Sequence, residues 1–450
     1  MEYLSASTAM TQIENSQLGL SEILDACLQR IASRESTVQA WTFLAVEAAR
    51  KQMALQAQQL HDRSPQAVLA QCPLFGIPVG VKDIFATVDL PTAWGLPLYR
   101  DRYLATDAAV VTRLKAAGAI ILGKTVTTEL ATAAAGPTRN PHHLDHTPGG
   151  SSSGSAAAVA DGMVPVAIGS QTMGSILRPA AYCGIFGFKP SFGRISRHGV
   201  MPVSTDLDHV GMFARCLEDI RRVFEVLVDR QSAFSEQGQP QSTCQRAHPP
   251  QLAWVPTPDW PMLEPSARNR LQQLVQSLSQ SAAAITRVDL PATELDYWAT
   301  TQTLCAYGLY QHHGSLLENH LTECSPQLQD WLRRGKEIDS SAYAVALDAQ
   351  KQYQVSTDNL LHNFDAILTP VTTGPAPHGL ENTGSPRFCS LWTLCGLPAI
   401  SLPIGKTSDG LPLACQLVGQ RNCDRQLLAI AEHCWKQALS SMGGVTVPDQ

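Results

Sequence analysis

Apolar residues recur at helical spacing near the start of the chain. Within the segment Leu18 to Ser33, one stripe carries Leu20, Ile23, Leu24, Cys27, Leu28 and Ile31. This period predicts an amphipathic helix, with Ser21 and Glu22 marking its start. The Ala- and Gln-rich stretch Val38 to His61 is predicted to continue as a long helix, which Ser64 to Pro73 ends.

Short apolar runs separated by Gly and Pro turns follow. Phe75 to Val81 predicts a buried strand that delivers Lys82 and Asp83 at its end. Thr106 to Ala117 has the pattern of an amphipathic helix, and Ala119 to Leu122 has that of a strand. Two further apolar runs, Val164 to Ile168 and Ile185 to Phe188, lie inside a stretch rich in Gly and Ser.

The second half of the chain repeats this alternation. The polar stretch Gln231 to Gln251, rich in Gln, Ser and Pro, predicts a surface loop. One more βαβ unit is expected from Leu252 to Leu290, and Tyr297 to Gln354 is predicted to be largely helical. Strands are expected at Ala366–Thr369, Ala399–Pro403 and Ala414–Val418, and helices at Leu217–Val228 and Arg425–Ala438.

Alternating helices and short buried strands favour an α/β fold with a mostly parallel interior. No break separates two self-sufficient halves, so residues 1–450 are expected to form a single domain. Within it we distinguish a helical segment (1–65), a core (66–230), the surface loop (231–251) and a C-terminal α/β part (252–440).

Composition narrows the class of protein. The chain is 44% hydrophobic and 16% charged, which suffices for a large core. Its net charge of −6, without a basic run, argues against direct binding of nucleic acid. We find neither a signal peptide nor a transmembrane segment, so a cytoplasmic location without membrane contact is expected. The twelve cysteines are scattered, with no Cys-x-x-Cys pair, and predict buried reduced thiols rather than a metal site.

Two nucleotide- or hydrolase-like motifs lack the context they need. Gly118 to Thr125 satisfies G-x-x-x-x-G-K-[ST], but its four middle residues are the predicted strand itself. Gly150 to Gly154 satisfies G-x-S-x-G, but a polar, turn-like segment precedes it where a nucleophile elbow needs a strand. The adjacent His312 and His313 are expected to be a surface pair, because neighbouring helical residues point to different sides.

The stretch from Pro148 to Arg197 combines Gly, Ser and apolar runs. Glycines beside hydroxyls in an apolar setting suggest a backbone brought close to a reacting group. Acyl transfer also needs a base, and no histidine lies inside this stretch. Lys82 could serve if burial lowers its pKa, although an ordinary solvated lysine remains the alternative at this point.

Several blocks of sequence together resemble the amidase signature family: IPVGVKD, GPTRNP, TPGGSSSGSAAAVADGMVP, IGSQTMGSILRPAAYCGIFGFKP and WTLCGLPAISLPIG followed by GLPLACQLVG. They occur in the family's order and span nearly the whole chain. The resemblance implies a large mixed, mostly parallel sheet covered by helices on both faces. It also implies an amidohydrolase that needs no metal or organic cofactor.

The family's Ser–cis-Ser–Lys triad maps onto this chain by motif position. The resemblance places the base at Lys82, the bridging serine with its cis peptide bond at Ser151, and the nucleophile at Ser175. An oxyanion hole is implied at the main-chain amides of Thr172, Met173, Gly174 and Ser175. Lys82 would take a proton from Ser151, and Ser151 would take one from Ser175.

Two positions depart from the family's usual pattern. Met173 stands where a glycine usually precedes Gly174, and it would strain the backbone if that position required a positive φ. Leu177 stands where an arginine is common, and Arg178 follows, as in the malonamidase-like branch. We therefore hypothesise that Arg178 binds an anionic acyl group, the alternative being an ion pair within the protein.

The leading expectation is an amidase that acts on a small linear amide. The alternatives are the glutaminase subunit of a tRNA-dependent amidotransferase and a catalytically degenerate family member. The expected partner is a small-molecule amide substrate, and a homodimer is possible. The physiological amide is left open by the sequence.

Overall fold

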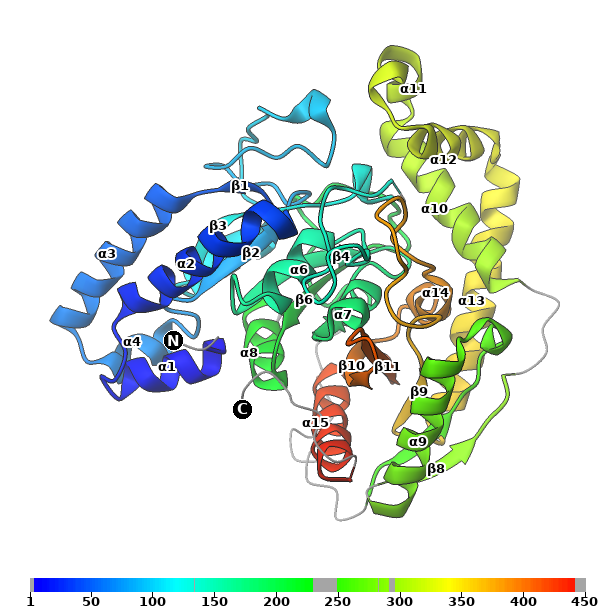
Figure 1. Cartoon of the computed structure of the whole chain (residues 1–450). Helices are drawn as coiled ribbons and strands as arrows, with labels where there is room; N and C mark the ends of the chain where they lie inside the picture. Colours follow the sequence, from blue (N-terminus) through cyan, green and yellow to red (C-terminus); the bar gives the residue numbers. More distant parts are fainter. Residues whose placement is uncertain (1–3, 133, 230–248, 282, 291–295, 442–450) are drawn as a thin grey trace.

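One large mixed sheet forms the centre of the molecule in a computed structural model that describes residues 4–132, 134–229, 249–281, 283–290 and 296–441 (Figure 1). Within the described residues, eleven strands lie in the order β1-β3-β2-β4-β6-β5-β10-β11-β9-β7-β8. Their bounds are β1 Trp41–Leu44, β2 Pro78–Lys82, β3 Ile120–Thr125, β4 Val166–Gln171, β5 Phe186–Lys189, β6 His209–Ala214, β7 Gln251–Trp254, β8 Ala284–Arg287, β9 Ala366–Pro370, β10 Ala399–Lys406 and β11 Pro412–Gly419.

The α/β class and the mixed sheet were predicted correctly, but parallel pairing does not predominate. Parallel pairs join β2 to β3 and β4, and β7 to β8 and β9. The other six pairings among the described strands are antiparallel, including the central β4–β6–β5–β10–β11–β9 run. Apolar strands buried on both faces look alike in either direction, so the pattern could not distinguish the two.

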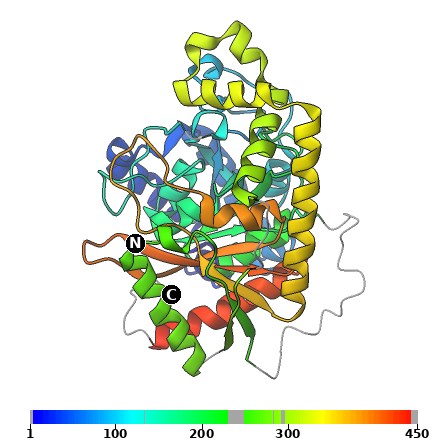
Figure 2. The ribbon, with the colours of Figure 1, turned by 90° about the vertical axis from the view of Figure 1, so that its right-hand side faces the viewer.

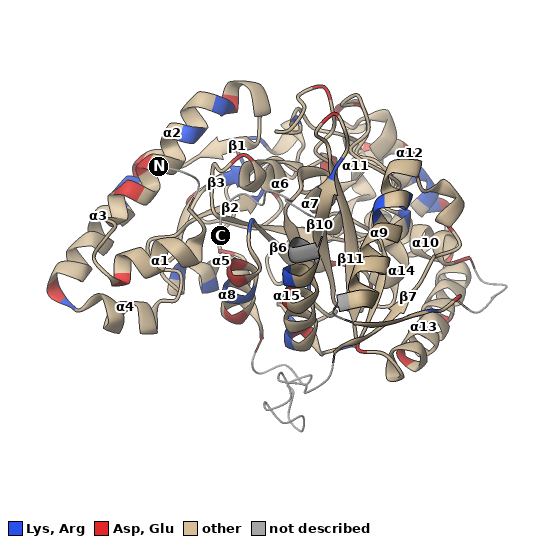
Figure 3. Ribbon diagram, turned by 60° about the horizontal axis from the view of Figure 1, so that its bottom comes forward, with Lys and Arg blue, Asp and Glu red and all other residues tan. Residues whose placement is uncertain are grey.

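Helices cover both faces of the sheet, as expected. Helices α6 (Ser153–Ala160) and α7 (Leu177–Cys183) pack against the centre of one face, and α8 (Leu217–Leu227) and α15 (Asp424–Ser441) pack against the other (Figure 3). The same view shows basic and acidic residues interspersed along the helices. The remaining α-helices of the N-terminal half are α1 Ala6–Glu14, α2 Leu20–Val38, α3 Val46–Asp62, α4 Pro65–Gln71 and α5 Ala109–Ala116.

The predicted helical region Tyr297 to Gln354 forms a separate layer beside the sheet (Figure 2). It contains α10 Tyr297–His313, α11 Ser315–Asn319, α12 Pro326–Glu337 and α13 Ser340–His362. Helix α10 packs against α12, α13 and α14 (Arg387–Leu394), and α14 lies between this layer and the sheet. The expected βαβ unit is present as β7, α9 (Pro265–Ser281) and β8.

The long helix predicted over Val38 to His61 is wrong, because a strand interrupts it. Helix α2 ends at Val38, and Gln39 adopts a left-handed conformation with φ 54°. The Glu35 carboxylate then accepts hydrogen bonds from the amides of Ala40 and Trp41 at 3.0 and 2.9 Å. Trp41 pairs with Thr125 as β1 joins the sheet edge. A local capping contact and a long-range strand pair therefore override the helical composition.

Smaller differences between the predicted and the observed structure concern segments outside the core. The predicted break at Ser64 to Pro73 contains the short helix α4, whose first turn is capped by the Ser64 hydroxyl. His313 is buried, so only His312 of the expected surface pair is exposed. Most of the predicted surface loop, residues 231–248, lies outside the described residues.

The described cysteines are all free thiols, and all of them are buried, as predicted, except Cys72, Cys216 and Cys423, which are partly exposed. Cys244 lies outside the described residues. None of the described helices is long and apolar enough to cross a membrane. In the described ranges, no group of three His, Cys, Asp or Glu side chains is arranged to hold a metal ion.

Candidate active site

Lys82 and Ser151 meet in the interior, at the carboxyl end of the parallel strands β2 and β4. Lys82 is the last residue of β2, as predicted, and its side chain is fully buried. Its Nζ donates hydrogen bonds to the hydroxyls of Ser151 and Ser170, each at 2.8 Å. The peptide bond between Gly150 and Ser151 is cis, as the family resemblance implied.

Ser170 was not among the predicted site residues. It lies on β4, which pairs in parallel with β2, so the sheet brings it beside Lys82. The sequence signal was present but weak: a hydroxyl at the end of an apolar strand, 88 positions from the lysine. Only the pairing of the two strands makes that signal interpretable.

The setting of Lys82 suits a general base. Burial lowers the pKa of Lys82 well below its ordinary value, the Asp208 carboxylate opposes this by raising it, and Arg178 lowers it further. Burial disfavours the charged form of an amine because the low-dielectric interior solvates it poorly. The direction of this shift favours the neutral, proton-accepting form of the amine, and the burial of Lys82 rules out the solvated-lysine alternative.

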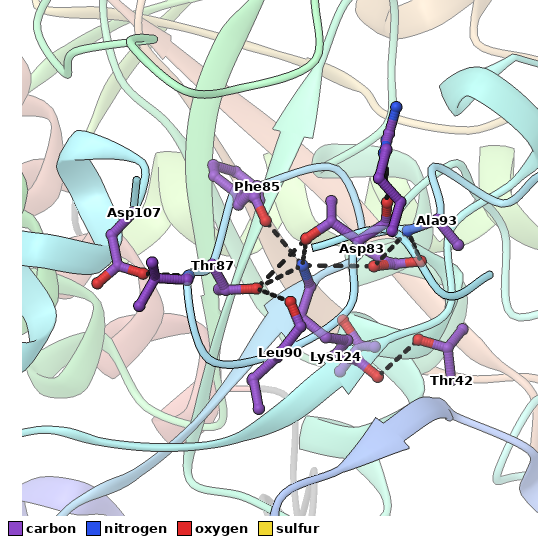
Figure 4. A network of polar contacts seen from close by, with 12 residues as sticks. Thr42, Asp83, Phe85, Thr87, Leu90, Ala93, Asp107 and Lys124 are labelled. Carbon is purple, nitrogen blue, oxygen red and sulfur yellow. Dashed lines mark hydrogen bonds and ion pairs between the residues drawn. The ribbon is translucent and has the colours of Figure 1, made fainter. Parts of the chain in front are cut away.

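A second buried lysine shows the contrasting arrangement (Figure 4). Lys124 on β3 lies 3.3 Å from the Asp83 carboxylate and donates to the Phe85 carbonyl at 2.7 Å. It also contacts the hydroxyls of Thr87 and Thr92 at 3.1 and 2.8 Å. Burial lowers the pKa of Lys124 only to about 8, because Asp83 stabilises the ammonium. Lys124 is thus buried and bonded within the protein, which does not fit a phosphate-binding loop and agrees with the rejection of the Gly118 to Thr125 motif.

Ser175 lies just before α7 and is the most accessible of the three predicted triad residues. Its exposed fraction is 7%, against 1% for Ser151 and 0% for Lys82. Among the described residues its hydroxyl forms no hydrogen bond to Ser151 or to Lys82. Catalytic hydrogen bonds are often long in a ligand-free enzyme and shorten when substrate binds. The assignment of Ser175 as nucleophile remains a prediction.

The loop from Thr172 to Ser175 presents free main-chain donors. In the described structure the amides of Thr172, Met173, Gly174 and Ser175 have no acceptor. The next two amides are occupied, because Gln171 Oε1 accepts hydrogen bonds from Ile176 and Leu177 at 2.8 and 3.0 Å. A run of N–H groups without acceptors, aimed at one place, is what an oxyanion hole requires. This arrangement supports the predicted hole without testing it.

The same loop is fixed from its other side by α14. Gln171 Nε2 donates to the Thr393 hydroxyl at 2.8 Å, and that hydroxyl lies 2.9 Å from the Met173 carbonyl. Met173 has no positive φ and packs half-buried against the core. The backbone strain considered for this residue is therefore absent. A Cβ added to the neighbouring Gly174 would lie 3.0 Å from Pro386, so the space here is small.

Arg178 contacts two main-chain carbonyls and a hydroxyl rather than a carboxylate. Its Nη2 donates to the Gly150 carbonyl at 2.6 Å and to the Thr383 hydroxyl at 3.1 Å. Its Nη1 donates to the Gly384 carbonyl at 2.9 Å. Neither an ion pair nor an open face toward solvent is found in the described part of the chain. These contacts favour a role within the protein, through hydrogen bonds instead of the ion pair considered above.

Asp208 is a second residue that sequence reasoning missed. It directly precedes β6, and its Oδ1 accepts a hydrogen bond from the Thr172 hydroxyl at 2.6 Å. It is also the carboxylate whose charge acts on Lys82. Carboxylates are common in loops that lead into strands. The position of Asp208 in the sequence alone would therefore not have identified it as a site residue.

Comparison with known proteins identifies the family. The profile of the amidase family matches residues 22–428 of the chain. A glutamyl-tRNA(Gln) amidotransferase subunit of Symbiobacterium thermophilum is 32% identical, over 95% of this chain and 97% of its own. A solved structure described as an amidase is 28% identical with a TM-score of 0.84, covering 97% of this chain and 99% of its own.

A further solved structure supports the fold alone. It comes from work on a vestigial protein complex and the origins of an s-triazine catabolic enzyme. It is 24% identical, covers 99% of this chain and 100% of its own, and has a TM-score of 0.87. The chain belongs to the amidase family. The predictions of the amidase signature family, its fold and an amidohydrolase are thereby confirmed.

Proposed function

We propose that the protein hydrolyses a carboxamide, with Ser175 as nucleophile, Ser151 as proton relay and Lys82 as base. The observation that carries the proposal is the fully buried Lys82 amine, whose pKa burial lowers, in hydrogen-bond contact with Ser151. A lysine kept uncharged in the interior is costly to the fold, and such groups concentrate at functional sites.

The proposed reaction proceeds through an acyl-enzyme. Lys82 Nζ accepts the proton of Ser151 Oγ while Ser151 accepts that of Ser175, whose Oγ attacks the amide carbonyl carbon. The amides of Thr172 to Ser175 stabilise the developing oxyanion. The proton returns through Ser151 to the leaving nitrogen, the C–N bond breaks, and ammonia or an amine departs. Water, deprotonated by the same relay, then cleaves the ester on Ser175 and releases the acid.

The comparisons favour the amidotransferase role over a free-standing small-molecule amidase. Curated relatives named as glutamyl-tRNA(Gln) amidotransferase subunits match nearly end to end at 28–32% identity. We therefore propose that the amide is glutamine or a similar primary amide and that further subunits accompany the chain. A cytoplasmic location, as first expected, suits this role.

Ammonia release tests the proposal. The purified chain is incubated with L-glutamine and, separately, with a panel of anionic, aliphatic and aromatic amides. Glutamine hydrolysis that increases in the presence of co-purified partner subunits supports the amidotransferase role. Rapid hydrolysis of another amide by the chain alone supports the small-molecule amidase instead. Failure of a fluorophosphonate to modify Ser175, together with no hydrolysis of any amide, supports the degenerate alternative.

A further inference from the structure

The carboxylate of Asp208 lies between the catalytic loop and the helical layer. One oxygen, Oδ1, accepts the hydrogen bond from Thr172, a residue of the predicted oxyanion hole. The other oxygen, Oδ2, accepts from the amides of Val203 and Ser204 at 2.8 and 3.0 Å. All three donors are neutral. The carboxylate therefore ties the loop at residues 203–208 to the loop that carries the proposed nucleophile.

Helices α10 and α13 fix the 203–208 loop and the residue before it from the opposite side. The His313 ring nitrogen Nε2 lies 2.8 Å from the Pro202 carbonyl. The Tyr343 hydroxyl donates to Asp206 Oδ2 at 2.6 Å. A Cβ added to Gly308 of α10 would lie only 2.7 Å from the Val203 carbonyl, so helix and loop are in close contact. These contacts fix the position of the loop where Asp208 meets Thr172.

We propose that Asp208 is a positioning residue of the catalytic centre: it anchors Thr172, and with it the oxyanion-hole amides, to the helical layer, and its negative charge acts on Lys82. The inference rests on the proposed function, since it assigns a task within that same site. Asp208 does not touch the reacting atoms, and it acts through Thr172 and Lys82.

The charged groups around Asp208 determine how replacing its carboxylate changes the pKa of Lys82. Burial raises the pKa of Asp208, whereas the hydrogen bond from Thr172, those from its own loop, and the Arg197 guanidinium lower it. Two other titratable groups face Asp208: Lys82 from β2 and Cys305 from α10. Besides Asp208, Arg178 is the charged residue that shifts the pKa of Lys82. Because Asp208 raises the pKa of Lys82, replacing it with a neutral residue should lower that pKa further.

Asp208→Asn separates these effects from simple loss of structure. The amide keeps the size of the carboxylate and still offers Oδ1 to Thr172, but its NH2 group faces the two N–H donors of Val203 and Ser204. Thr172→Val removes the hydroxyl donor and leaves the charge in place. Asp206→Asn is the matched control, because it removes a carboxylate from the same loop while its amide oxygen can still accept the hydrogen bond from Tyr343, and Asp206 does not bond Thr172.

The readout is the rate at which a fluorophosphonate modifies Ser175 of the full chain between pH 5 and 9, with folding checked by circular dichroism. We expect Thr172→Val to slow the reaction about tenfold, the effect of losing a charge-assisted hydrogen bond. Asp208→Asn should slow it by a similar factor, because its hydrogen bond from Thr172 is no longer charge-assisted and its NH2 group opposes the Val203 and Ser204 amides. Only Asp208→Asn should move the acid limb of the profile to lower pH, and Asp206→Asn should do neither.

A folded Asp208→Asn variant with the wild-type rate and acid limb would overturn the inference. If that variant does not fold, a Thr172→Val rate equal to the wild-type rate would overturn it instead. A wild-type chain that is not modified at Ser175 refutes the proposed function itself, so the two failures are distinguishable.

Discussion

Two buried lysines lie at the carboxyl ends of β2 and β3. The same substitution at each should affect the stability of the protein and the reactivity of Ser175 in opposite ways. Lys82 and Lys124 are both fully buried. Lys124 lies 3.3 Å from Asp83, and the side chains of this pair are 0% and 2% exposed. Lys82 has only the hydroxyls of Ser151 and Ser170 as hydrogen-bond acceptors among the described residues. Replacing each lysine with methionine, which has a similar length and no charge, compares the two directly.

The expected losses of stability follow from these contacts. Lys124→Met leaves the Asp83 carboxylate buried without its cation, and breaking a buried ion pair in this way costs roughly 3–5 kcal/mol. Lys82→Met removes two hydrogen bonds to hydroxyls, each contributing about 1 kcal/mol. It also removes an amine whose burial is unfavourable, so its free energy of unfolding should stay within about 2 kcal/mol of the wild type.

Urea unfolding followed by tryptophan fluorescence measures the stabilities, and fluorophosphonate labelling of the folded fraction measures the reactivity of Ser175. Lys82→Met should unfold near the wild-type midpoint and fail to react. Lys124→Met should unfold at clearly lower urea, and its folded fraction should still react. The double variant Asp83→Asn/Lys124→Met is the control, and it should regain part of the lost stability. Equal losses of stability in the two single variants, or a reactive Lys82→Met protein, would refute the reasoning.

Three further predictions follow from the site. Lys82 has a pKa of about 10.4 in the unfolded chain, and burial holds its pKa well below that value in the folded chain. The stability of the wild type relative to Lys82→Met should therefore rise as the pH increases toward 10 in urea titrations, and a constant difference would contradict the lowered pKa. Arg178→Met should lower kcat/KM equally for anionic and neutral amides, whereas a loss confined to anionic amides would restore the substrate-carboxylate hypothesis. Met173→Gly should cost about 0.5–1 kcal/mol in thermal or urea unfolding without accelerating labelling, and a much faster reaction would show that the Met173 side chain obstructs the site.

The parts of the site that lie within one stretch of sequence were predictable, and those created by strand pairing were not. An apolar run ending in Lys82 made a buried lysine a candidate, with a solvated lysine as the alternative, and the family resemblance then favoured the buried one. The approach of Ser170 depends on β2 and β4 pairing in parallel, which no local pattern encodes. The role of Asp208 likewise depends on a contact with Thr172, 36 positions away.

In the fold as well, elements with a local sequence pattern were predictable, and those that depend on strand pairing were not. Helices with a clear apolar stripe, such as α2, were recognised because burial of one face determines their pattern. The strand β1 was missed because its four residues exist as a strand only through pairing with β3. The direction of the central strands was misjudged for a related reason, since both faces of the sheet are covered and most residues there are apolar or small.

The central claim is that Ser175 is the nucleophile, activated through Ser151 by a neutral Lys82. Mass spectrometry of peptides from the fluorophosphonate-treated protein tests it most directly. The account predicts a single adduct, on Ser175 of the wild type, that is absent from Ser175→Ala and from folded Lys82→Met. An adduct on another residue, or amide hydrolysis by Ser175→Ala at the wild-type rate, would contradict it.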